Sequence, residues 1–588
     1  MRQVPVLVVG GSLTGLSAAL FLTAHGVPVT VVERRPAVLA HPRLRGLLPR
    51  TMELYRQAGL EPDILAVCPP GVSAGHLPSV HAPTLADAYE LLGDAGRGDA
   101  ESDGDGDGDG DGNGNGNEEA LSPCAFVPIG QHELEGLLVE RLRERDCELC
   151  FGTEASGLVQ DEHGVTVLLH RPDGTAETVR ARWLVAADGA SGAVRRRLGI
   201  AVHGPGTLFR MATTHVEADL APALRGRPVG MAYLDRPAPG TTLGPLDASG
   251  RHWFFATALP PDAPVAEEDL LDRLRVATGL PDLRARLLPQ GPDLPPVMAF
   301  PVGARVAERF AEGRVLLAGD AAHLMPPTGS LGGHTGVEDA HNLAWKLAAV
   351  LHGSADPALL GTYDAERRPV AERNAREAQL RARARWRLPG HDGDARLTDM
   401  DRLLYGGVYR SSAVPGASPP PAQGPLDQPP VPAPLDQPPG TKPVDRPPPA
   451  QNPVDQLPVP APLDPRTLGG VPGTRAPHVP VSQDGAAPVS TLDLYGTRLV
   501  VLVGPDGDTW ASAADRAAKA LGVPVEVYHL DTDLSAPHGL GARGALLVRP
   551  DGYVAWRSAD GPAPAEDADA VVAAVLAAVL GRPPVGSS

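Results

Sequence analysis

The sequence has few cysteines, no long apolar run and no excess of basic residues. Only four cysteines occur in 588 residues, which excludes a fold built on disulfides. No apolar run reaches the roughly 18 residues that a membrane-spanning helix needs. The formal net charge of −19 argues against a nucleic-acid-binding protein. These absences leave an acidic chain that we expect in the cytoplasm, long enough for about two to four domains.

Two patterns resemble metal sites, and we expect neither to bind metal. Cys147 and Cys150 form a C-x-x-C pair in a strand-like run, so structural thiols are favoured over metal or redox use. In the Gly/Asp insert of residues 93–119, a D-G repeat formally matches the EF-hand calcium loop. Its flanks lack the required amphipathic helices, and its composition indicates a disordered surface loop. The matching residues are Asp107, Asp109, Asp111, Gly112 and Glu118.

The first 33 residues have the pattern of a strand, a helix and a second strand. The apolar runs 4–9 and 28–33 predict buried parallel strands. Apolar residues with helical spacing predict a helix over 15–25. Together these segments form one βαβ unit.

The turn of this unit carries a dinucleotide-binding fingerprint, Gly10-x-Ser12-x-x-Gly15, with Glu33 at the end of the second strand. Gly10 permits the tight turn, and Gly15 permits close packing of the helix on the strand. The free N–H groups of the helix N-terminus suit a pyrophosphate, and Glu33 suits the ribose hydroxyls. Ser12 replaces the middle glycine of the fingerprint. This pattern alone does not separate NAD from FAD.

Two further segments indicate FAD. WLVAADGASGAVRRRLG (183–199) places Asp188-Gly189 after a buried strand, and GDAAHLMPPTGSLGGHTGVEDAHNLAWKL (319–347) places Gly319-Asp320 after another. Three separated segments that contribute to one site are more than a transiently bound nicotinamide cofactor requires. The triple resembles the class A flavoprotein monooxygenases, which have the p-hydroxybenzoate hydroxylase fold, over roughly residues 1–410.

Closer features resemble the aromatic polyketide hydroxylases. They are HPRLRGLLPRTMELYRQAGL (41–60), the segment from Gly319 described above, and LVRPDGYVAWR (547–557). That group has a C-terminal thioredoxin-like domain without redox cysteines, and the end of this chain contains no cysteine. The patterns there predict a small α/β domain, with strands over 497–504 and 523–530, helices over 513–521 and 566–580, and a hairpin over 544–557.

The expected fold class is therefore α/β. A Rossmann-type FAD domain is interleaved with a sheet-based substrate domain, and a small thioredoxin-like domain follows. A Pro-rich segment with an imperfect PLDQPP repeat is expected to be an extended linker, with partner docking as the alternative. The expected divisions are 1–92, 120–200 and 301–411 for the FAD-binding domain, 93–119 for the insert, 201–300 for the substrate-binding domain, 412–478 for the linker and 479–588 for the thioredoxin-like domain.

The resemblance implies a set of contacts to non-covalent FAD. Asp320 matches the carboxylate that contacts the ribityl chain, and the following helix, over about 337–352, points its N-terminus at the flavin ring. The paired glycines before it admit the ring against bare backbone, and nearby prolines stiffen the wall. The residues expected at the cofactor are Gly10, Ser12, Gly15, Glu33, Arg34, Arg43, Arg45, Gln131, Asp188, Asp320, Pro326, Gly332, Gly333 and His334.

Two positions depart from the family pattern. His334 stands where the family usually has Asn after the glycine pair, which alters flavin electrostatics and pH dependence or supplies the same hydrogen bond. Gly192 stands where the family usually has Ser, with Ser191 one residue earlier.

The resemblance implies a monooxygenase that uses NADPH or NADH as a transient co-substrate and O2. Through a flavin C4a-hydroperoxide it would hydroxylate a polycyclic aromatic small molecule in antibiotic biosynthesis. Baeyer–Villiger insertion, epoxidation and a non-catalytic FAD-fold binding protein are the alternatives. No local motif identifies a catalytic base, and a homodimer stays open. The residues that could line a substrate pocket are Phe209, Met211, Met231, Tyr233, Trp253, Phe254 and Phe255.

Overall fold

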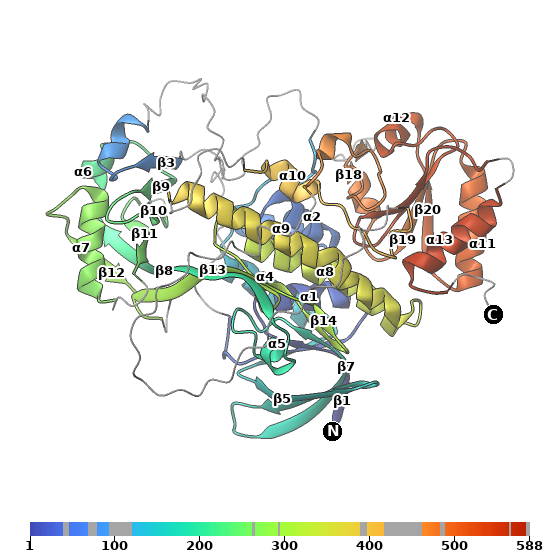
Figure 1. The fold of residues 1–588 in the computed structure, drawn as a ribbon, viewed down its shortest axis with the longest axis horizontal. Coiled ribbons are helices and arrows are strands. Elements are labelled where there is room, and N and C mark those ends of the chain that lie inside the picture. The colour runs from blue at the N-terminus through green and yellow to red at the C-terminus, as the bar shows by residue number, and fades with distance from the viewer. Residues whose placement is uncertain are drawn as a thin grey trace, which may run out of the picture.

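The computed structural model places two long helices across the centre of the molecule, between one sheet at one end and a small C-terminal domain at the other (Figure 1). A further sheet lies below the helices in this view. The described residues are 1–38, 46–68, 79–92, 120–247, 249–260, 265–291, 294–387, 397–416, 461–481, 489–563 and 566–583. The 93–119 insert lies outside these ranges, as do residues 417–460 of the Pro-rich segment.

The first sheet has mainly parallel strands in the order β14-β15-β7-β1-β2-β4, and β6 joins β5 to β7. Strand β1 pairs in parallel with β2 and with β7, which confirms the expected βαβ unit. All five residues of β2 are buried, as expected for a parallel strand covered on both faces. The strands are β1 Arg2–Val9, β2 Val29–Glu33, β4 Cys147–Phe151, β5 Glu154–Asp161, β6 Gly164–His170, β7 Ala176–Ala186, β14 Ala311–Glu312 and β15 Val315–Leu317.

The helices that pack with this sheet include the two long central ones, α8 and α9. Helix α8 is buried along nearly its whole length, as its apolar sequence requires. Polar residues are nevertheless buried on both central helices, so they need partners inside the protein. The helices are α1 Leu13–Ala24, α2 Pro49–Gln57, α3 Glu61–Val67, α4 Gln131–Arg143, α5 Ala193–Arg197, α8 Leu331–Leu351, α9 Gly361–Arg385 and α10 Met400–Tyr405.

The second sheet has the order β16-β13-β8-β11-β10-β9-β3, and β12 pairs with β8. Its strands are antiparallel except for β3, which pairs with β9 in parallel. Helices α6 Ala221–Leu224 and α7 Glu267–Thr278 accompany it. The strands are β3 Ser79–Ala82, β8 Val202–Ala218, β9 Met231–Leu234, β10 Thr241–Pro245, β11 His252–Leu259, β12 Ala285–Leu288, β13 Val297–Ala307 and β16 His323–Leu324.

The C-terminal domain has a four-stranded sheet in the order β20-β19-β21-β22. The strands, helices and hairpin expected from the sequence are confirmed, within a few residues at their ends. They are β19 Leu499–Val503, α11 Asp508–Leu521, β20 Val525–His529, α12 Thr532–Ser535, β21 Ala545–Val548, β22 Val554–Ser558 and α13 Ala568–Val579, preceded by the short pair β17 Pro480–Val481 and β18 Val489–Ser490.

The chain passes repeatedly between the first two sheets, which confirms the interleaved α/β fold. Strand β3 of the second sheet comes between β2 and β4 of the first, and β16 follows β15. Short 3-10 helices complete the fold. They are η1 Asp87–Glu90, η2 Gly319–Ala321, η3 Pro357–Leu360, η5 Pro465–Thr467, η6 Thr491–Leu494 and η7 Ala536–His538. In the part of the chain that the structure describes, no helix combines the length and apolarity that crossing a membrane demands.

Candidate cofactor site

The loop between β1 and α1 requires glycine at two positions. Gly10 has a φ of +111°, and a Cβ there would lie 2.1 Å from the carbonyl oxygen of Ala187. A Cβ on Gly15 would lie 1.8 Å from the carbonyl oxygen of Gly10. Both distances are far below van der Waals contact, so a larger residue would force the backbone apart. The close approach that the fingerprint predicts is therefore present.

Glu33, at the end of β2, is buried and holds this loop. Its Oε2 accepts a hydrogen bond from the Gly11 N–H (2.8 Å), and its Oε1 accepts from the backbone and Nε of Arg35 (3.0 and 2.9 Å). Burial opposes ionisation, but the hydrogen bonds from Arg35 and Gly11 hold the pKa of Glu33 below its usual value. The carboxylate is thus charged at neutral pH. Arg34, the next residue, is exposed.

Glu135 of α4 is a residue of the site that the sequence analysis missed. Its Oε1 accepts from Ser12 Oγ (2.6 Å), the Leu13 N–H (2.9 Å) and Gln131 Nε2 (2.7 Å). The side chain is 1% exposed. A carboxylate at a helix N-terminus accepts hydrogen bonds from the free N–H groups and interacts favourably with the helix dipole. Glu135 therefore fixes two predicted cofactor residues, Ser12 and Gln131, against α1; its spacing of four from Gln131 was the available signal.

Asp188 lies against the same loop, at the end of β7. Its Oδ2 accepts from the Val194 N–H (2.9 Å) and so caps the short helix α5. Its Oδ1 is buried and has no hydrogen-bond partner among the described residues. Burial raises the pKa of this carboxyl group. Gly192, which precedes α5, has a φ of +53°, a conformation that favours glycine over the serine usual in the family.

The Gly319-Asp320 segment packs on α1 through another close contact. A Cβ on Gly319 would lie 2.4 Å from Thr14 Oγ1, and a Cβ on Gly336 would lie 2.5 Å from the same atom. Helix α1, the turn η2 and helix α8 therefore meet at Thr14. Asp320 is on the exposed side of η2, whereas Pro326 is buried.

Helix α8 begins earlier than the sequence predicted, at Leu331 rather than near 337. Ser330 has a φ of +54°, which turns the chain so that the helix starts at once. Gly332 and Gly333 thus lie in the first turn of the helix, not before it. A Cβ on Gly332 would meet only Met325 Cγ, at an ordinary 3.4 Å, so packing within the protein does not require glycine there.

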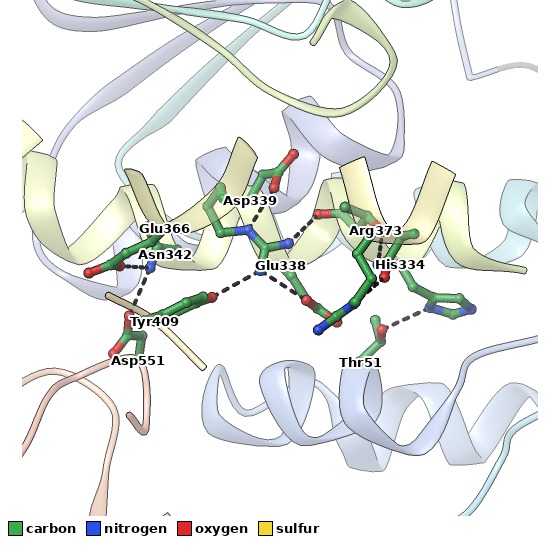
Figure 2. A network of polar contacts seen from close by, with 12 residues as sticks. Thr51, His334, Glu338, Asp339, Asn342, Glu366, Arg373, Tyr409 and Asp551 are labelled. Atoms are coloured by element: carbon green, nitrogen blue, oxygen red, sulfur yellow. Dashed lines mark hydrogen bonds and ion pairs between the residues drawn. The ribbon is translucent and has the colours of Figure 1, made fainter. Parts of the chain in front are cut away.

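His334, also in the first turn of α8, is 2% exposed. Its Nδ1 and Thr51 Oγ1 of α2 are 2.8 Å apart (Figure 2). Its Nε2 is buried and has no hydrogen-bond partner in the described ranges. Burial lowers the pKa of His334 to about 3, so the imidazole is neutral at physiological pH. Arg43 and Arg45 lie outside the described residues.

The structure thus gathers three separated segments into one region: the β1–α1 loop with Gln131, the Asp188 turn, and the turn from Gly319 into α8. Asp188 and His334 each have a buried polar atom that finds no partner among the described residues. Such atoms are costly unless a ligand or water satisfies them. Contact of each residue with a cofactor stays a prediction.

The second sheet separates the expected pocket residues onto two faces. Phe209, Met211, Met231, Tyr233 and Phe254 cluster with Trp386 from the end of α9. Trp253 and Phe255 instead join the core that includes residues of α7. Consecutive residues of a strand point to opposite faces of the sheet. Trp253 and Phe255 therefore lie on one face of β11, and Phe254 lies on the other. The first face also carries two buried polar atoms without a partner in the described structure, Thr242 Oγ1 and Trp386 Nε1.

The thiols and carboxylates of the described residues form no metal cluster. Cys147 and Cys150 stand three residues apart on strand β4, so their side chains point to opposite faces. Burial raises the pKa of both thiols, that of Cys147 to about 12. Within those ranges no three His, Cys, Asp or Glu side chains are placed to share an ion. The EF-hand-like pattern lies outside the described residues.

Comparison with known families gives two matches. Residues 3–378 match the FAD binding domain family, and residues 469–583 match the family described as aromatic-ring hydroxylase, C-terminal. The first match covers more than half of the chain and contains all three segments of the candidate site.

Individual relatives match along the whole chain. Tetracenomycin A2 monooxygenase-dioxygenase of Streptomyces glaucescens is 36% identical over 99% of this chain and 97% of its own length. Aklavinone 12-hydroxylase of Streptomyces purpurascens is 35% identical, covering 99% of each chain. The crystal structure of aklavinone-11 hydroxylase with FAD and aklavinone superposes with a TM-score of 0.79 at 32% identity, over 99% of this chain and 100% of that one.

Proposed function

This chain belongs to the family of FAD-dependent aromatic-ring monooxygenases, and on that premise we propose that it inserts one atom of O2 into a polycyclic aromatic polyketide. The proposed outcome is hydroxylation of a ring carbon during natural-product biosynthesis. NADPH or NADH supplies the electrons. Family membership supports the reaction class, and the relatives that act on tetracenomycin A2 and aklavinone support the substrate class.

One observation carries the proposal: three separated segments meet at the β1–α1 loop, and Asp188 and His334 of these segments have buried polar atoms without a partner among the described residues. The contacts of Gly319 and Gly336 with Thr14 bring the third segment onto α1, and the contact of Gly10 with Ala187 brings the Asp188 turn against the β1–α1 loop. Asp188 Oδ1 and His334 Nε2 have no hydrogen-bond partner among the described residues. A large polar ligand such as FAD supplies such partners, so the residues present fit this cofactor.

The fit suggests a role for each segment. The N-terminus of α1 would hold the pyrophosphate, with Ser12 fixed in advance by Glu135. Glu33 would accept from the ribose hydroxyls. The glycine turn at the start of α8 would face the flavin ring, and the helix dipole would favour negative charge there. Bound there, FAD would carry electrons from the nicotinamide to oxygen and deliver one oxygen atom.

The face of the second sheet that carries Phe209, Tyr233 and Phe254 is the proposed substrate surface. Its aromatic side chains suit a flat, largely apolar ligand. Trp386 Nε1, which has no partner within the described ranges, is a donor, and the Thr242 hydroxyl is a donor or acceptor. Both therefore suit carbonyl or phenolic oxygens on such a ligand. Trp253 and Phe255 are assigned to the core instead.

The first experiment is an absorbance spectrum of the purified protein, followed by NADPH and NADH oxidation in air. A bound-flavin spectrum and oxidation stimulated by anthracyclinone or tetracenomycin-type compounds are expected, with a product containing one more oxygen atom. The product's structure separates hydroxylation from Baeyer–Villiger insertion and epoxidation. Bound FAD without stimulated oxidation would favour the binding-protein alternative. A protein that takes up no FAD would refute the proposal.

A matched pair of glycine variants tests where FAD binds. Gly15→Ala places a methyl group 1.8 Å from the Gly10 carbonyl oxygen, so we expect FAD affinity to fall at least about tenfold. Gly136→Ala is the control, because nothing lies within 4 Å of a Cβ there although α4 belongs to the same site. Isothermal titration of FAD into both apoproteins measures the difference. Equal affinities would place the cofactor elsewhere.

Other expectations from the sequence stay proposals beside this one. They are a homodimer, which light scattering would test, a cytoplasmic location, and the domain boundaries.

A further inference from the structure

The C-terminal domain reaches helix α8 with the tip of its β21–β22 hairpin. Asp551, at the tip, is 1% exposed. Its Oδ2 accepts from Asn342 Nδ2 of α8 (3.0 Å; Figure 2). The same oxygen accepts from Trp345 Nε1, also on α8 (3.1 Å). Two hydrogen bonds from one helix to one carboxylate fix the hairpin tip on that helix.

A second carboxylate, Glu366 of α9, joins the same elements. It accepts from Lys346 Nζ (2.7 Å) and Asn342 Nδ2 (2.8 Å) of α8. Arg549 of the hairpin donates two hydrogen bonds to it (2.6 and 2.8 Å). Arg549 also pairs with Asp551. All four charged side chains are buried, with two positive and two negative charges, so the cluster is complete only when the C-terminal domain is docked.

A second route runs from the hairpin to the Gly319 turn. Tyr553 stacks on Tyr409 with ring centroids 3.9 Å apart. The Tyr409 hydroxyl accepts from Arg367 (2.9 Å), whose Nε donates to Asp339 of α8 (2.8 Å). Asp339 in turn accepts from the Gly319 N–H (3.2 Å). Hydrogen bonds and a ring stack thus connect the C-terminal domain to the turn that precedes Asp320.

A third route reaches the first turn of α8. Arg475, which precedes the C-terminal domain in a described part of the Pro-rich segment, donates to both oxygens of Glu53 on α2 (2.9 and 2.5 Å). Glu53 also pairs with Arg50 (2.7 Å). Thr51, which lies between Arg50 and Glu53 on α2, is hydrogen-bonded to His334. The C-terminal part of the chain therefore reaches the candidate site through α2 as well as through α8.

We propose that the C-terminal domain positions the cofactor site, with Asp551 as the positioning residue that fixes α8 and its glycine-rich first turn. The inference rests on the proposed function in that α8 faces FAD. Apolar packing could join two domains at least as stably, whereas buried ionic contacts define one geometry. The domain would thus influence flavin binding through the position of α8, and its sequence contains no cysteine.

The test compares Asp551→Ala with Asp551→Asn and with Val575→Ala, in the full chain. Asp551→Ala removes the one oxygen that accepts both hydrogen bonds from α8, whereas Asp551→Asn retains one oxygen that can accept them. Val575 lines the core of the C-terminal domain beside Val501 and Trp510, so its truncation weakens that domain without touching the hairpin tip. Amide hydrogen exchange over residues 331–338, the thermal midpoint, and FAD affinity are measured for each variant.

In Asp551→Ala we expect exchange over 331–338 to rise and FAD affinity to fall, each about tenfold, with partial rescue in Asp551→Asn. Val575→Ala should lower the thermal midpoint but leave exchange over 331–338 unchanged. If Asp551→Ala behaves like Val575→Ala, the proposal is wrong. If Asp551→Ala does not fold, Tyr409→Phe removes a single hydroxyl from the second route and must still raise exchange at Gly319 and in the first turn of α8.

Hydrogen exchange is measured on the apoprotein, so the two proposals fail separately. A wild-type protein that never binds FAD refutes the proposed function, while the exchange result still decides whether the domain positions α8. A wild-type protein that binds FAD, with Asp551→Ala unchanged in exchange and affinity, refutes only the positioning role.

Discussion

The buried imidazole of His334 makes the free energy of unfolding depend on pH. His334 is neutral because burial lowers its pKa to about 3, and burial acts in the same direction on His341, to about 3, and His25, to about 4. In the unfolded chain a histidine titrates near 6.5. Below that pH the unfolded state binds protons that the folded state does not, so folding becomes less favourable as pH falls.

We therefore expect the free energy of unfolding to fall steeply between pH 6.5 and 4.5, and His334→Asn to reduce that slope by about 1.4 kcal/mol per pH unit. Stability above pH 6.5 would not gain from this effect. Chemical denaturation at pH 4.5, 5.5 and 6.5 measures the slope. His163→Asn is the control, because that side chain is exposed to solvent in the folded protein. Parallel slopes for wild type and His334→Asn would contradict the assignment.

The role of a residue could be predicted from the sequence where a local steric contact determines it. It could not be predicted where a contact with a segment distant in the sequence determines it. Gly10 and Gly15 belong to a local pattern whose cause is a backbone contact, so the motif alone located them. Glu135 has the sequence context of an ordinary surface helix residue; only the approach of α1, far away in the sequence, makes it a buried cap. Arg34 is exposed to solvent.

At the scale of elements, a strand pattern predicts alternation but not which face binds substrate. Phe254 and Phe255 are adjacent on β11, yet the first joins the Trp386 cluster and the second is fully buried in the other core. Sequence reasoning could place both in the substrate domain only. Their faces follow from the packing of α7 on one face and of α9, which is distant in the chain, on the other.

This pair of neighbours gives a direct test. Phe255→Ala should cost about 3–5 kcal/mol of stability, because it leaves a cavity in a closed core. Phe254→Ala should cost less stability and raise KM for the aromatic substrate about tenfold, because it removes part of the proposed substrate surface. Denaturation curves and steady-state kinetics measure the two effects. A KM that changes only in Phe255→Ala would contradict the placement of Phe254, rather than Phe255, on the proposed substrate surface.

The start of α8 shows a second limit at this scale. The glycine-rich run predicted an irregular entrance before a helix near 337, yet the helix begins at Leu331. The left-handed Ser330 supplies the turn, and the glycines, despite their low helix propensity, lie inside the first turn. A ligand lying against bare helix backbone would explain the glycine at position 332, where packing within the protein does not require one.

At the scale of the whole molecule, the buried ion cluster makes the domains interdependent. Arg549→Met leaves Glu366 with Lys346 as its one remaining cation in the cluster and deprives Asp551 of Arg549, so we expect a loss of about 3–5 kcal/mol. We also expect one unfolding transition to separate into two. Denaturation followed by flavin release and by tryptophan fluorescence measures both. Arg516→Met is the control, since its partner Asp569 belongs to an exposed pair on the same domain. An unchanged single transition in Arg549→Met would show that the cluster does not couple the domains.

The hairpin tip also has a consequence for how the protein is made. Glu366 and Arg549 are 183 residues apart in the sequence. At about 5–20 residues per second, the ribosome needs roughly 10–40 seconds to pass from one to the other. Throughout that interval Glu366 and Lys346 lack the cation and the carboxylate that complete their cluster, so α8 cannot reach its final setting while the chain is growing. Chimeras between relatives should for the same reason exchange Asn342, Glu366, Arg549 and Asp551 as one unit.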